Sequence, residues 1–268
     1  MSHATPKSNS KPLPDVIPPV KNFPLRVTVP AELRDIMGRT VGYALDFVLE
    51  TLDYSPDEPF VPTNEADLRL QPSADPMMKE QYCMVLWNDD KHSFDEVIKI
   101  LCDLTNRTRE EASDITHKTD GNGREIIEMG TDVVRLLDVA QTIAQIDLGV
   151  TVRRAYDTFR EQVAAVVIEW LLDLTRSRLG SDTLILREII AEELLSPRNR
   201  DRTAFNALQD TLPDVPNPAR IDSLFLYHTR LWKKPRLSLK EIYTAVLTLS
   251  RDHKLAVGMF LFSPWIAL

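Results

Sequence analysis

The stretch Tyr82–Ile98, with the sequence YCMVLWNDDKHSFDEVI, decides the fold of the chain around it. It begins with apolar, strand-forming residues, and the Asn-Asp-Asp that follows favours a turn. Ser93 and Glu96 form a capping box, a pattern that marks the first turn of a helix. Apolar residues at helical spacing continue to Leu104, so that one face of this helix is apolar. The sequence therefore predicts a tight strand-to-helix corner that carries four polar side chains: Asn88, Asp89, Asp90 and His92.

The same reasoning extends over residues 78–155 and predicts a small unit of strands and helices. A second capping box, Thr108 with Glu111, opens a helix that should run to about residue 118. Residues 120–123 (Asp-Gly-Asn-Gly) favour a turn, because glycine supplies positive φ and asparagine tolerates it. This β-α-α-β-α-β order predicts an α+β sandwich of a small sheet with helices on one face. The expected elements are a strand at 81–87, helices at 93–105 and 108–118, a strand at 124–129, a helix capped by Thr131, and a strand at 150–152.

The remainder of the chain divides into three further regions. Residues 1–24 are rich in Pro, Ser and Lys and are expected to be a disordered tail. Residues 25–77 should hold a helix at 30–53 and a Pro-rich linker that either drapes over a surface or joins two units. Residues 156–268 are expected to form an all-α helical region. Four helices are predicted there: 155–177, a segment capped by Ser181-Asp182, 220–232 and 239–256. A capping box of Ser238 and Glu241 opens the last of them. The first carries the apolar residues Phe159, Val163, Val166, Val167, Trp170 and Leu174.

Composition narrows the class of protein. Apolar residues are 43% of the 268 residues, enough for a sizeable core. The formal net charge is −8 and basic runs are short, which argues against a nucleic-acid surface. The two cysteines, Cys83 and Cys102, form no C-x-x-C pair and indicate a reducing compartment without a disulfide framework. No signal peptide is visible and no apolar run reaches the roughly 20 residues that cross a membrane, so we expect no membrane partner.

The corner has four chemical interpretations on its residues alone. It can be a capped turn with no further role, since Asn-Asp before a helix is common. Asp89, Asp90 and His92 can be metal ligands if they converge, which spacing cannot show. A carboxylate and an imidazole can carry out acid–base chemistry, although no nucleophile or phosphate loop accompanies them. Finally, the carboxylates can hold a cation whose apolar appendage lies against Phe94 and Val97.

This region contains two motifs. The first is Tyr82-Cys83-x-Val85-Leu86-x-Asn88-Asp89-Asp90 with His92, and the second is Asp120-Gly121-x-Gly123-Arg124. They resemble the ClpS-like N-domain of the eukaryotic UBR-type N-recognins, and bacterial ClpS has the same Asn-Asp-Asp corner. The element order of residues 78–155 also resembles ClpS. The resemblance extends more weakly over 25–60 and 155–256, toward the fungal N-recognin ubiquitin ligases. It implies a receptor for proteins that begin with a bulky hydrophobic residue (type 2 N-degrons), which marks them for ubiquitin-dependent degradation.

The resemblance also implies a role for each residue of the site. Asn88 would orient the backbone of the first ligand residue, and Asp89 or Asp90 would hold its ammonium group. Asp120 stands where ClpS has a histidine and would add charge attraction for the same amine, while His92 matches a histidine of the N-recognins. Two threonines replace Met and Val of ClpS and would make the pocket more polar. The hydrophobic pocket is implied to consist of Phe94, Val97, Thr116 and Thr119.

The chain alone is not expected to transfer ubiquitin, although the family it resembles consists of RING-type ligases. A RING binds two zinc ions through about eight Cys and His ligands, and this chain has two Cys and five His. A zinc-rich UBR box is missing for the same reason, so we expect no cofactor in this chain. The expected partners are substrates with hydrophobic N-termini, an E2 and the remaining ligase domains. The expected location is the cytoplasm, with the nucleus as a second option. The resemblance ends near Val257, and residues 258–268 suggest a truncation or an artefact of the gene model.

A second function remains open at this point. The chain can be a non-catalytic helical scaffold that has lost N-degron binding and serves only in protein–protein docking. A Phe-initiated peptide separates the two functions, because the scaffold should not bind it. A third class, a hydrolase that uses Asp89 and His92, would need an activated nucleophile that the sequence does not display.

Overall fold

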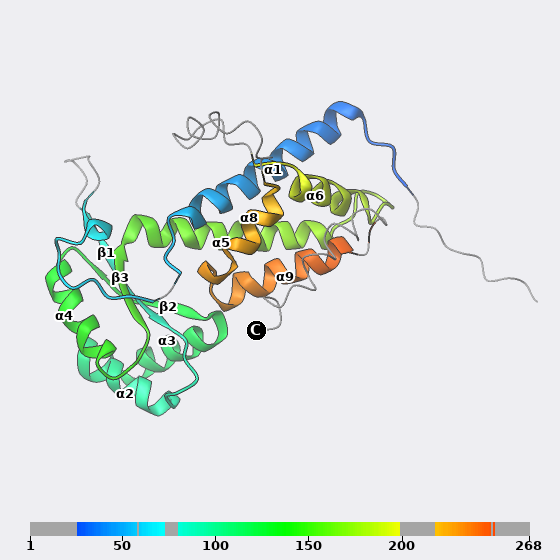
Figure 1. Cartoon of the computed structure of the whole chain (residues 1–268). Helices are drawn as coiled ribbons and strands as arrows, with labels where there is room; N and C mark the ends of the chain where they lie inside the picture. The colour runs from blue at the N-terminus through cyan, green and yellow to red at the C-terminus, as the bar shows by residue number, and fades with distance from the viewer. Residues whose placement is uncertain (1–25, 58, 73–79, 199–217, 248, 250–268) are drawn as a thin grey trace, which may run out of the picture.

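The structure is a computed structural model that describes residues 26–57, 59–72, 80–198, 218–247 and 249 (Figure 1). It confirms an α+β fold, with a small sheet at one end and a bundle of helices that extends from it. The tail predicted at 1–24 and the last turns of the helix predicted at 239–256 lie outside the described residues.

Three strands form the sheet, with β1 (Tyr82–Trp87) in the centre. β2 (Arg124–Gly130) and β3 (Val150–Arg154) pair with β1 on either side, both antiparallel. The first five residues of β1 are all buried, which is why its sequence is a continuous apolar run rather than an alternating one. The predicted strands are confirmed, each with bounds within two residues of those expected.

Three helices cover one face of the sheet: α2 (Phe94–Thr105), α3 (Arg109–Asn122) and α4 (Val133–Ala144). Side chains of β1 alternate between the two faces of the sheet, and those on this face meet the apolar sides of the helices. The result is an apolar core, in which the following side chains are at most 1% exposed: Met84, Leu86, Leu101, Ile127 and Leu136.

The starts of these helices follow their caps. Ser93 and Thr108 each accept a hydrogen bond from the backbone of the glutamate three residues on, so both predicted capping boxes are confirmed. α4 begins after Asp132, whose side chain caps it, so the predicted cap Thr131 lies one residue too early. The turn predicted at 120–123 is wrong, because its residues form the last turn of α3 and the glycine that ends it.

The opposite face of the sheet is covered too, which corrects the prediction of helices on one face only. β3 passes directly into the long helix α5 (Ala155–Arg176) without an intervening loop. Ala155 packs there against Cys83 and Val85, which point away from the helices on the first face. The cluster on this second face is completed by Trp87 and Ile126.

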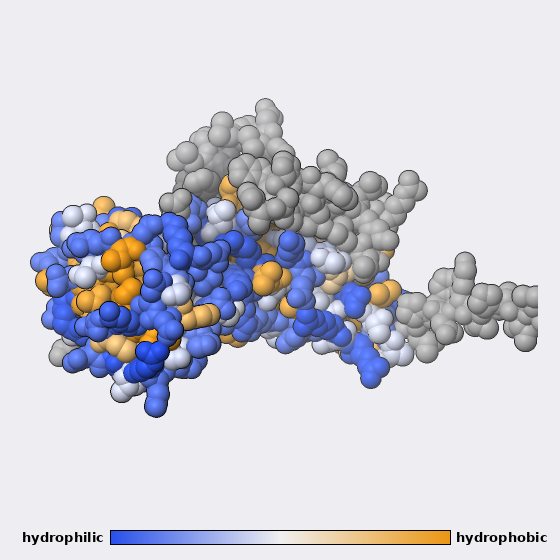
Figure 2. All heavy atoms as spheres, turned by 90° about the horizontal axis from the view of Figure 1, so that it is seen from below, coloured by the Kyte–Doolittle hydropathy of each residue, from blue (hydrophilic) through white to orange (hydrophobic). Residues whose placement is uncertain are grey.

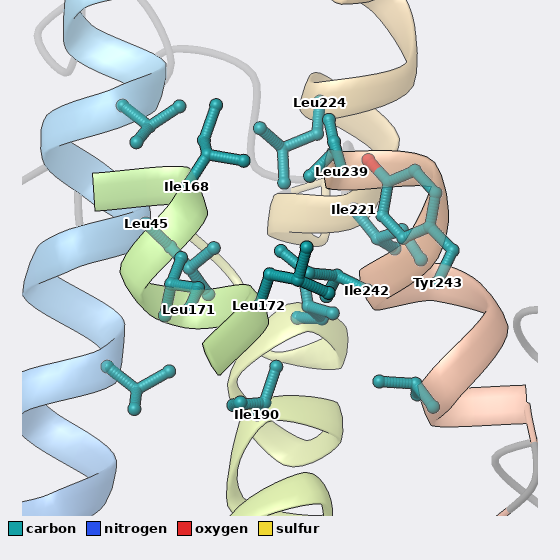
Figure 3. Packing of buried hydrophobic residues seen from close by; sticks show 14 of the residues in the cluster. Leu45, Ile168, Leu171, Leu172, Ile190, Ile221, Leu224, Leu239, Ile242 and Tyr243 are labelled. Atoms are coloured by element: carbon teal, nitrogen blue, oxygen red, sulfur yellow. The ribbon is translucent and has the colours of Figure 1, made fainter. Parts of the chain in front are cut away.

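The helical end has its own apolar core. Besides α5 it is built from α1 (Ala31–Asp53), α6 (Ile185–Leu195), α8 (Arg220–Leu226) and α9 (Lys233–Leu247). Figure 3 shows side chains from these helices meeting in one cluster, and their burial stabilises the bundle at about 25 cal/mol per Å². Each helix contributes to it, as these residues illustrate: Leu45, Ile168, Ile190, Ile221 and Ile242.

The Pro-rich segment at 59–72 lies along the sheet, which is one of the two arrangements expected for it. Its short 3₁₀ helix η1 (Leu68–Leu70) contacts β3. Leu70 is only 1% exposed, and its carbonyl accepts a hydrogen bond from the Tyr82 hydroxyl at 3.0 Å. The segment therefore contributes to the core of the sheet end.

The start of α9 differs from the prediction. α9 begins at Lys233, so the capping box proposed at Ser238 is wrong and that residue lies inside the helix. The helices predicted at 220–232 and 239–256 leave Pro235 in the connection between them, but proline fits the first turn of a helix, where backbone N–H groups have no intrahelical partner. The helix predicted at 220–232 accordingly ends at Leu226 and is followed by a 3₁₀ turn, η2 (His228–Arg230).

A buried cluster of charges joins the sheet to the helical end. Arg124 Nη1 of β2 lies 2.6 Å from Glu161 Oε2 of α5, and Arg153 Nη1 of β3 lies 2.6 Å from Glu161 Oε1. The Ser55 hydroxyl donates to the same carboxylate at 2.6 Å. Burial alone raises the pKa of Glu161, but the two guanidinium groups outweigh it and hold the pKa below its ordinary value. The Arg124 guanidinium also lies 3.5 Å from the ring centroid of Trp232, so both ends of the molecule share it.

The substitution Gly123→Ala is expected to destabilise the protein by about 1–3 kcal/mol. Gly123 has a φ of 99°, and a Cβ there would lie 2.6 Å from the backbone nitrogen of Lys233. Gly121→Ala is a matched control in the same helix turn, because a Cβ at Gly121 meets nothing within 4 Å. That control should be neutral or stabilise by up to about 1 kcal/mol, since alanine favours a helix over glycine. Thermal unfolding measures both, and equal stabilities would contradict the close approach of α9.

Apolar surface is distributed unevenly over the molecule. Figure 2 shows it gathered at the sheet end, whereas the helical end is mainly hydrophilic on the face in view. Along α5 four apolar side chains of one stripe stay exposed: Phe159, Val163, Val166 and Trp170. Among the described helices, none combines the length and the apolar character needed to span a bilayer.

Candidate functional site

Two backbone hydrogen bonds hold the corner that follows β1. The Trp87 N–H donates to the Gly149 carbonyl at 2.8 Å, and the Asn88 N–H donates to the Gly123 carbonyl at 2.9 Å. Gly123 ends α3 and Gly149 precedes β3, so the corner lies where three segments meet. Within the described part of the chain no group hydrogen-bonds the Asn88 side chain, which leaves its carboxamide for a ligand.

Asp89 is the anchor of the corner. Its Oδ1 accepts hydrogen bonds from the backbone N–H groups of Lys91 at 2.9 Å and His92 at 3.0 Å. Its Oδ2 lies 2.9 Å from Nδ1 of the His92 ring. Partial burial raises the pKa of Asp89, but these hydrogen bonds outweigh it and hold the pKa below its ordinary value. The carboxylate is therefore charged at neutral pH and held in one orientation.

His92 is expected to titrate above pH 6.5, the ordinary value, because its hydrogen bond to Asp89 favours the protonated ring. Since the pKa is raised on folding, the stability that the pair contributes is complete below pH 6.5 and is lost as pH rises through the raised pKa. An NMR titration of the ring measures the pKa of His92, and Asp89→Asn should bring that pKa back toward 6.5. His228 serves as an internal reference, because burial holds its pKa below 6.5 in both proteins. An unchanged His92 titration in the variant would contradict the pairing.

A pocket of about 120 Å³ opens beside the corner. This volume is below the roughly 150 Å³ of a cavity that holds benzene, so the pocket has room for no more than one side chain. Eight of the nine predicted site residues line it: Asn88, Asp89, His92, Phe94, Val97, Thr116, Thr119 and Asp120. Residues from the corner after β1, from α2 and from α3 are thus brought together, although the two motifs lie about thirty positions apart in the sequence.

Two carboxylates belong to this pocket. The Asp89 side chain is 18% exposed, and the Asp120 side chain is 52% exposed. Asp120 lies in the last turn of α3, where the negative end of the helix dipole also favours a cation. Lys233 of α9 approaches it, with Nζ 3.9 Å from Asp120 Oδ1. The pocket therefore joins an anionic rim to an apolar interior.

The pocket wall is less polar than its residue types imply. The hydroxyls of Thr116 and Thr119 donate to the backbone carbonyls of Ala112 and Ile115, both at 2.8 Å. Their donors are used inside α3, so each threonine offers the pocket a methyl group and an oxygen that can only accept. Phe94 is 46% exposed and borders the opening.

Some residues of the site differ from those predicted. Asp90 is exposed and does not line the pocket, because Asp89 alone turns inward to cap the corner. His117 stacks on Phe94 with ring centroids 5.0 Å apart. Three apolar lining residues were missed: Leu86, Trp87 and Leu148. The first two end β1 and follow from its direction, whereas no sequence signal marks Leu148.

The pocket offers no set of metal ligands in the described structure. Asp89 pairs with His92, but Asp90 points to solvent, so the three residues do not converge as a metal site requires. More generally, no group of three or more His, Cys, Asp or Glu residues within the described ranges could hold a metal ion.

Comparison with known proteins adds two matches. Residues 77–146 match the family model of the ATP-dependent Clp protease adaptor protein ClpS. The chain is also 27% identical, over 303 aligned positions, to the E3 ubiquitin-protein ligase ubr1 of Schizosaccharomyces pombe. That alignment covers 86% of this chain and 15% of the relative, so the chain spans a small part of the length of the ligase. The chain is thus similar to a ClpS domain over the residues around the pocket, and to part of the ubr1 ligase over most of its length.

Proposed function

We propose that the pocket binds the free N-terminus of a protein that begins with a bulky hydrophobic residue. The α-ammonium group of the ligand contacts Asp89 and Asp120, and the Asn88 carboxamide orients the first peptide unit. The first side chain enters the apolar interior, whose walls include Phe94 and Val97. An α-amino group has a pKa near 7.7–8.0 and is mostly cationic at pH 7, so it suits the anionic rim.

One observation carries this proposal: two carboxylates and an apolar slot sized for one side chain belong to the same pocket. A metal site would need more converging ligands, and a hydrolase would need a nucleophile beside the Asp89–His92 pair. A cation joined directly to a bulky apolar group satisfies both parts of the pocket at once. The N-terminal residue of a polypeptide is such a group, because its amine and its side chain share one carbon atom.

The similarity to the ubr1 ligase supports a wider role. We propose that this chain is the substrate-recognition part of a ubiquitin ligase, with the E2 and the catalytic domains supplied by other polypeptide. Its substrates would be proteins with exposed hydrophobic N-termini in the cytoplasm and nucleus. Alone, with E1, E2, ubiquitin and ATP, the chain should give no ubiquitin chains above background.

A set of fluorescent peptides that differ only in the first residue tests the specificity. Peptides that begin with Phe, Leu, Trp, Tyr or Ile should bind at least about tenfold more tightly than those that begin with Arg or Lys, because a charged head group would have to leave water to enter the slot. Fluorescence anisotropy measures the dissociation constants. Equal affinity for Phe- and Arg-initiated peptides would contradict hydrophobic specificity, and no binding of any peptide would favour the scaffold function.

A further inference from the structure

Lys233, at the start of α9, meets the end of α3. Its Nζ donates a hydrogen bond to the backbone carbonyl of Asp120 at 2.8 Å and lies 3.9 Å from the Oδ1 of the same residue. The last carbonyls of a helix have no partner within the helix, so a lysine ammonium there satisfies one of them. The helical end of the molecule thereby places a positive charge beside a residue of the pocket rim.

The backbone around Lys233 is fixed by its neighbours. Gly123 has no side chain, which allows the Lys233 backbone to approach the end of α3 closely. The preceding residue, Trp232, is 7% exposed and stacks on Arg124 at 3.5 Å. The same Arg124 guanidinium lies 5.3 Å from the ring centroid of Trp87, which lines the pocket. Two consecutive residues of the helical end are therefore anchored to the walls of the site.

The charge of Lys233 is only partly neutralised. Lys91, in the corner, pairs with Asp147, and Lys118, on α3, pairs with Asp114 at 2.7 Å. By contrast, the carboxylate oxygen nearest to the Lys233 ammonium among the described residues lies 3.9 Å away, beyond hydrogen-bond distance, and the Lys233 side chain is 47% exposed. Its field therefore reaches the pocket rim at Asp120, where the proposed function would place the second residue of a bound peptide.

We propose that Lys233 is a specificity-determining residue of the pocket, which disfavours N-termini whose second residue is basic. This inference rests on the proposed function of the pocket. The carboxylates of Asp89 and Asp120 accommodate the single charge of the α-ammonium group. A lysine or arginine at the second position brings another cation within a screening length of Lys233, about 8 Å at physiological salt. At about 6 Å in water with physiological salt, repulsion of a second-position lysine and attraction of a second-position glutamate each change affinity roughly 1.7-fold. Together they change the ratio of the two affinities about threefold.

The test compares two peptides, one that begins Phe-Lys and one that begins Phe-Glu, on four proteins. The ratio of their dissociation constants is the readout, because a loss of pocket shape would weaken both peptides alike. Lys233→Gln removes the charge but keeps an N–H donor, and Lys233→Arg keeps both. Lys234→Gln is the matched control, since Lys234 is the next residue, is similarly exposed and pairs instead with Glu169 at 2.7 Å.

Relative to wild type, Lys233→Gln should shift the ratio about threefold in favour of the Phe-Lys peptide, and 1 M salt should abolish the shift. Lys233→Arg and Lys234→Gln should leave the ratio within about 1.5-fold of wild type. Anisotropy titrations are precise enough to distinguish a 1.5-fold change from a threefold change. An unchanged ratio in Lys233→Gln, or an equal shift in Lys234→Gln, would overturn the inference while leaving the proposed function intact. If wild type binds neither peptide, the proposed function fails, and this inference fails with it.

Discussion

A Phe-initiated peptide with an acetylated N-terminus should bind at least about thirtyfold more weakly than the same peptide with a free amine. Acetylation removes the positive charge and two hydrogen-bond donors but leaves the phenylalanine side chain unchanged. Loss of one partner from a hydrogen-bonded charge pair at a desolvated site costs about 2–5 kcal/mol, which corresponds to roughly thirtyfold to several thousandfold in affinity. Because Asp120 is half exposed, the lower part of this range is the expected one.

Variants of the two carboxylates separate their contributions. Asp89→Asn and Asp120→Asn should each weaken the free peptide while changing the acetylated one by less than about twofold. Asp90→Asn is the matched control, since Asp90 carries the same group in the same corner but does not line the pocket.

Raising the pH above about 8 should weaken binding of the free peptide as its amine deprotonates. Binding of the acetylated peptide within about threefold of the free one would show that the corner is not a receptor for N-termini, and the capped-turn interpretation would then be preferred.

The second large effect concerns stability: Glu161→Ala should lower the free energy of unfolding by about 3–5 kcal/mol. The Glu161 side chain is 3% exposed and holds Arg124, Arg153 and the Ser55 hydroxyl. Its removal leaves two guanidinium groups near a desolvated site without their counter-charge. Arg124 is also the residue that joins Trp87 of the sheet end to Trp232 of the helical end, so the variant should loosen the junction first.

Urea or thermal unfolding followed by circular dichroism measures this loss. Glu241→Ala provides the control, because Glu241 also pairs with an arginine, Arg176, but both side chains are 58% exposed. An exposed pair of this kind contributes about 0–1 kcal/mol. If the two variants lose the same small amount, the buried cluster does not hold the two ends together. If Glu161→Ala unfolds outright, Glu161→Gln, which keeps the shape, should show an intermediate loss.

Local patterns account for what the sequence predicted well. The capping boxes at Ser93 and Thr108 depend only on residues three positions apart, and both helices begin where these boxes predict. β1 was recognisable because a short apolar run between turn residues suits a strand that is buried on both faces. The two short motifs contain four of the eight predicted residues that line the pocket, and the wider resemblance to ClpS supplied the other four: Phe94, Val97, Thr116 and Thr119.

Long-range contacts account for what the sequence did not reveal. The apolar residues singled out on α5 include Phe159, Val163 and Trp170, which remain substantially exposed, because the core face of that helix is built largely from smaller or polar side chains such as Ala164 and Glu161. Burial of a charge cannot be predicted from one segment when its partners lie on another.

The same limit applies at the pocket. Lys233 lies 113 positions from Asp120, and the Lys-Lys-Pro-Arg segment that contains it favours a solvated connection when read alone. Pro235 reinforced that interpretation, since nothing local distinguishes a proline that ends one helix from a proline in the first turn of the next.

The direct passage of β3 into α5 has a mechanical consequence for the molecule. A strand hydrogen-bonded into the sheet and a helix of 22 residues form one continuous lever with no hinge at the joint. At 1.5 Å per residue the helix is about 33 Å long, so a tilt of the sheet by about 5° would displace the far end of the helix by about 3 Å. A ligand that shifts the strands around the pocket would therefore displace the far end of α5. A protein bound at that far end would in turn restrain the pocket.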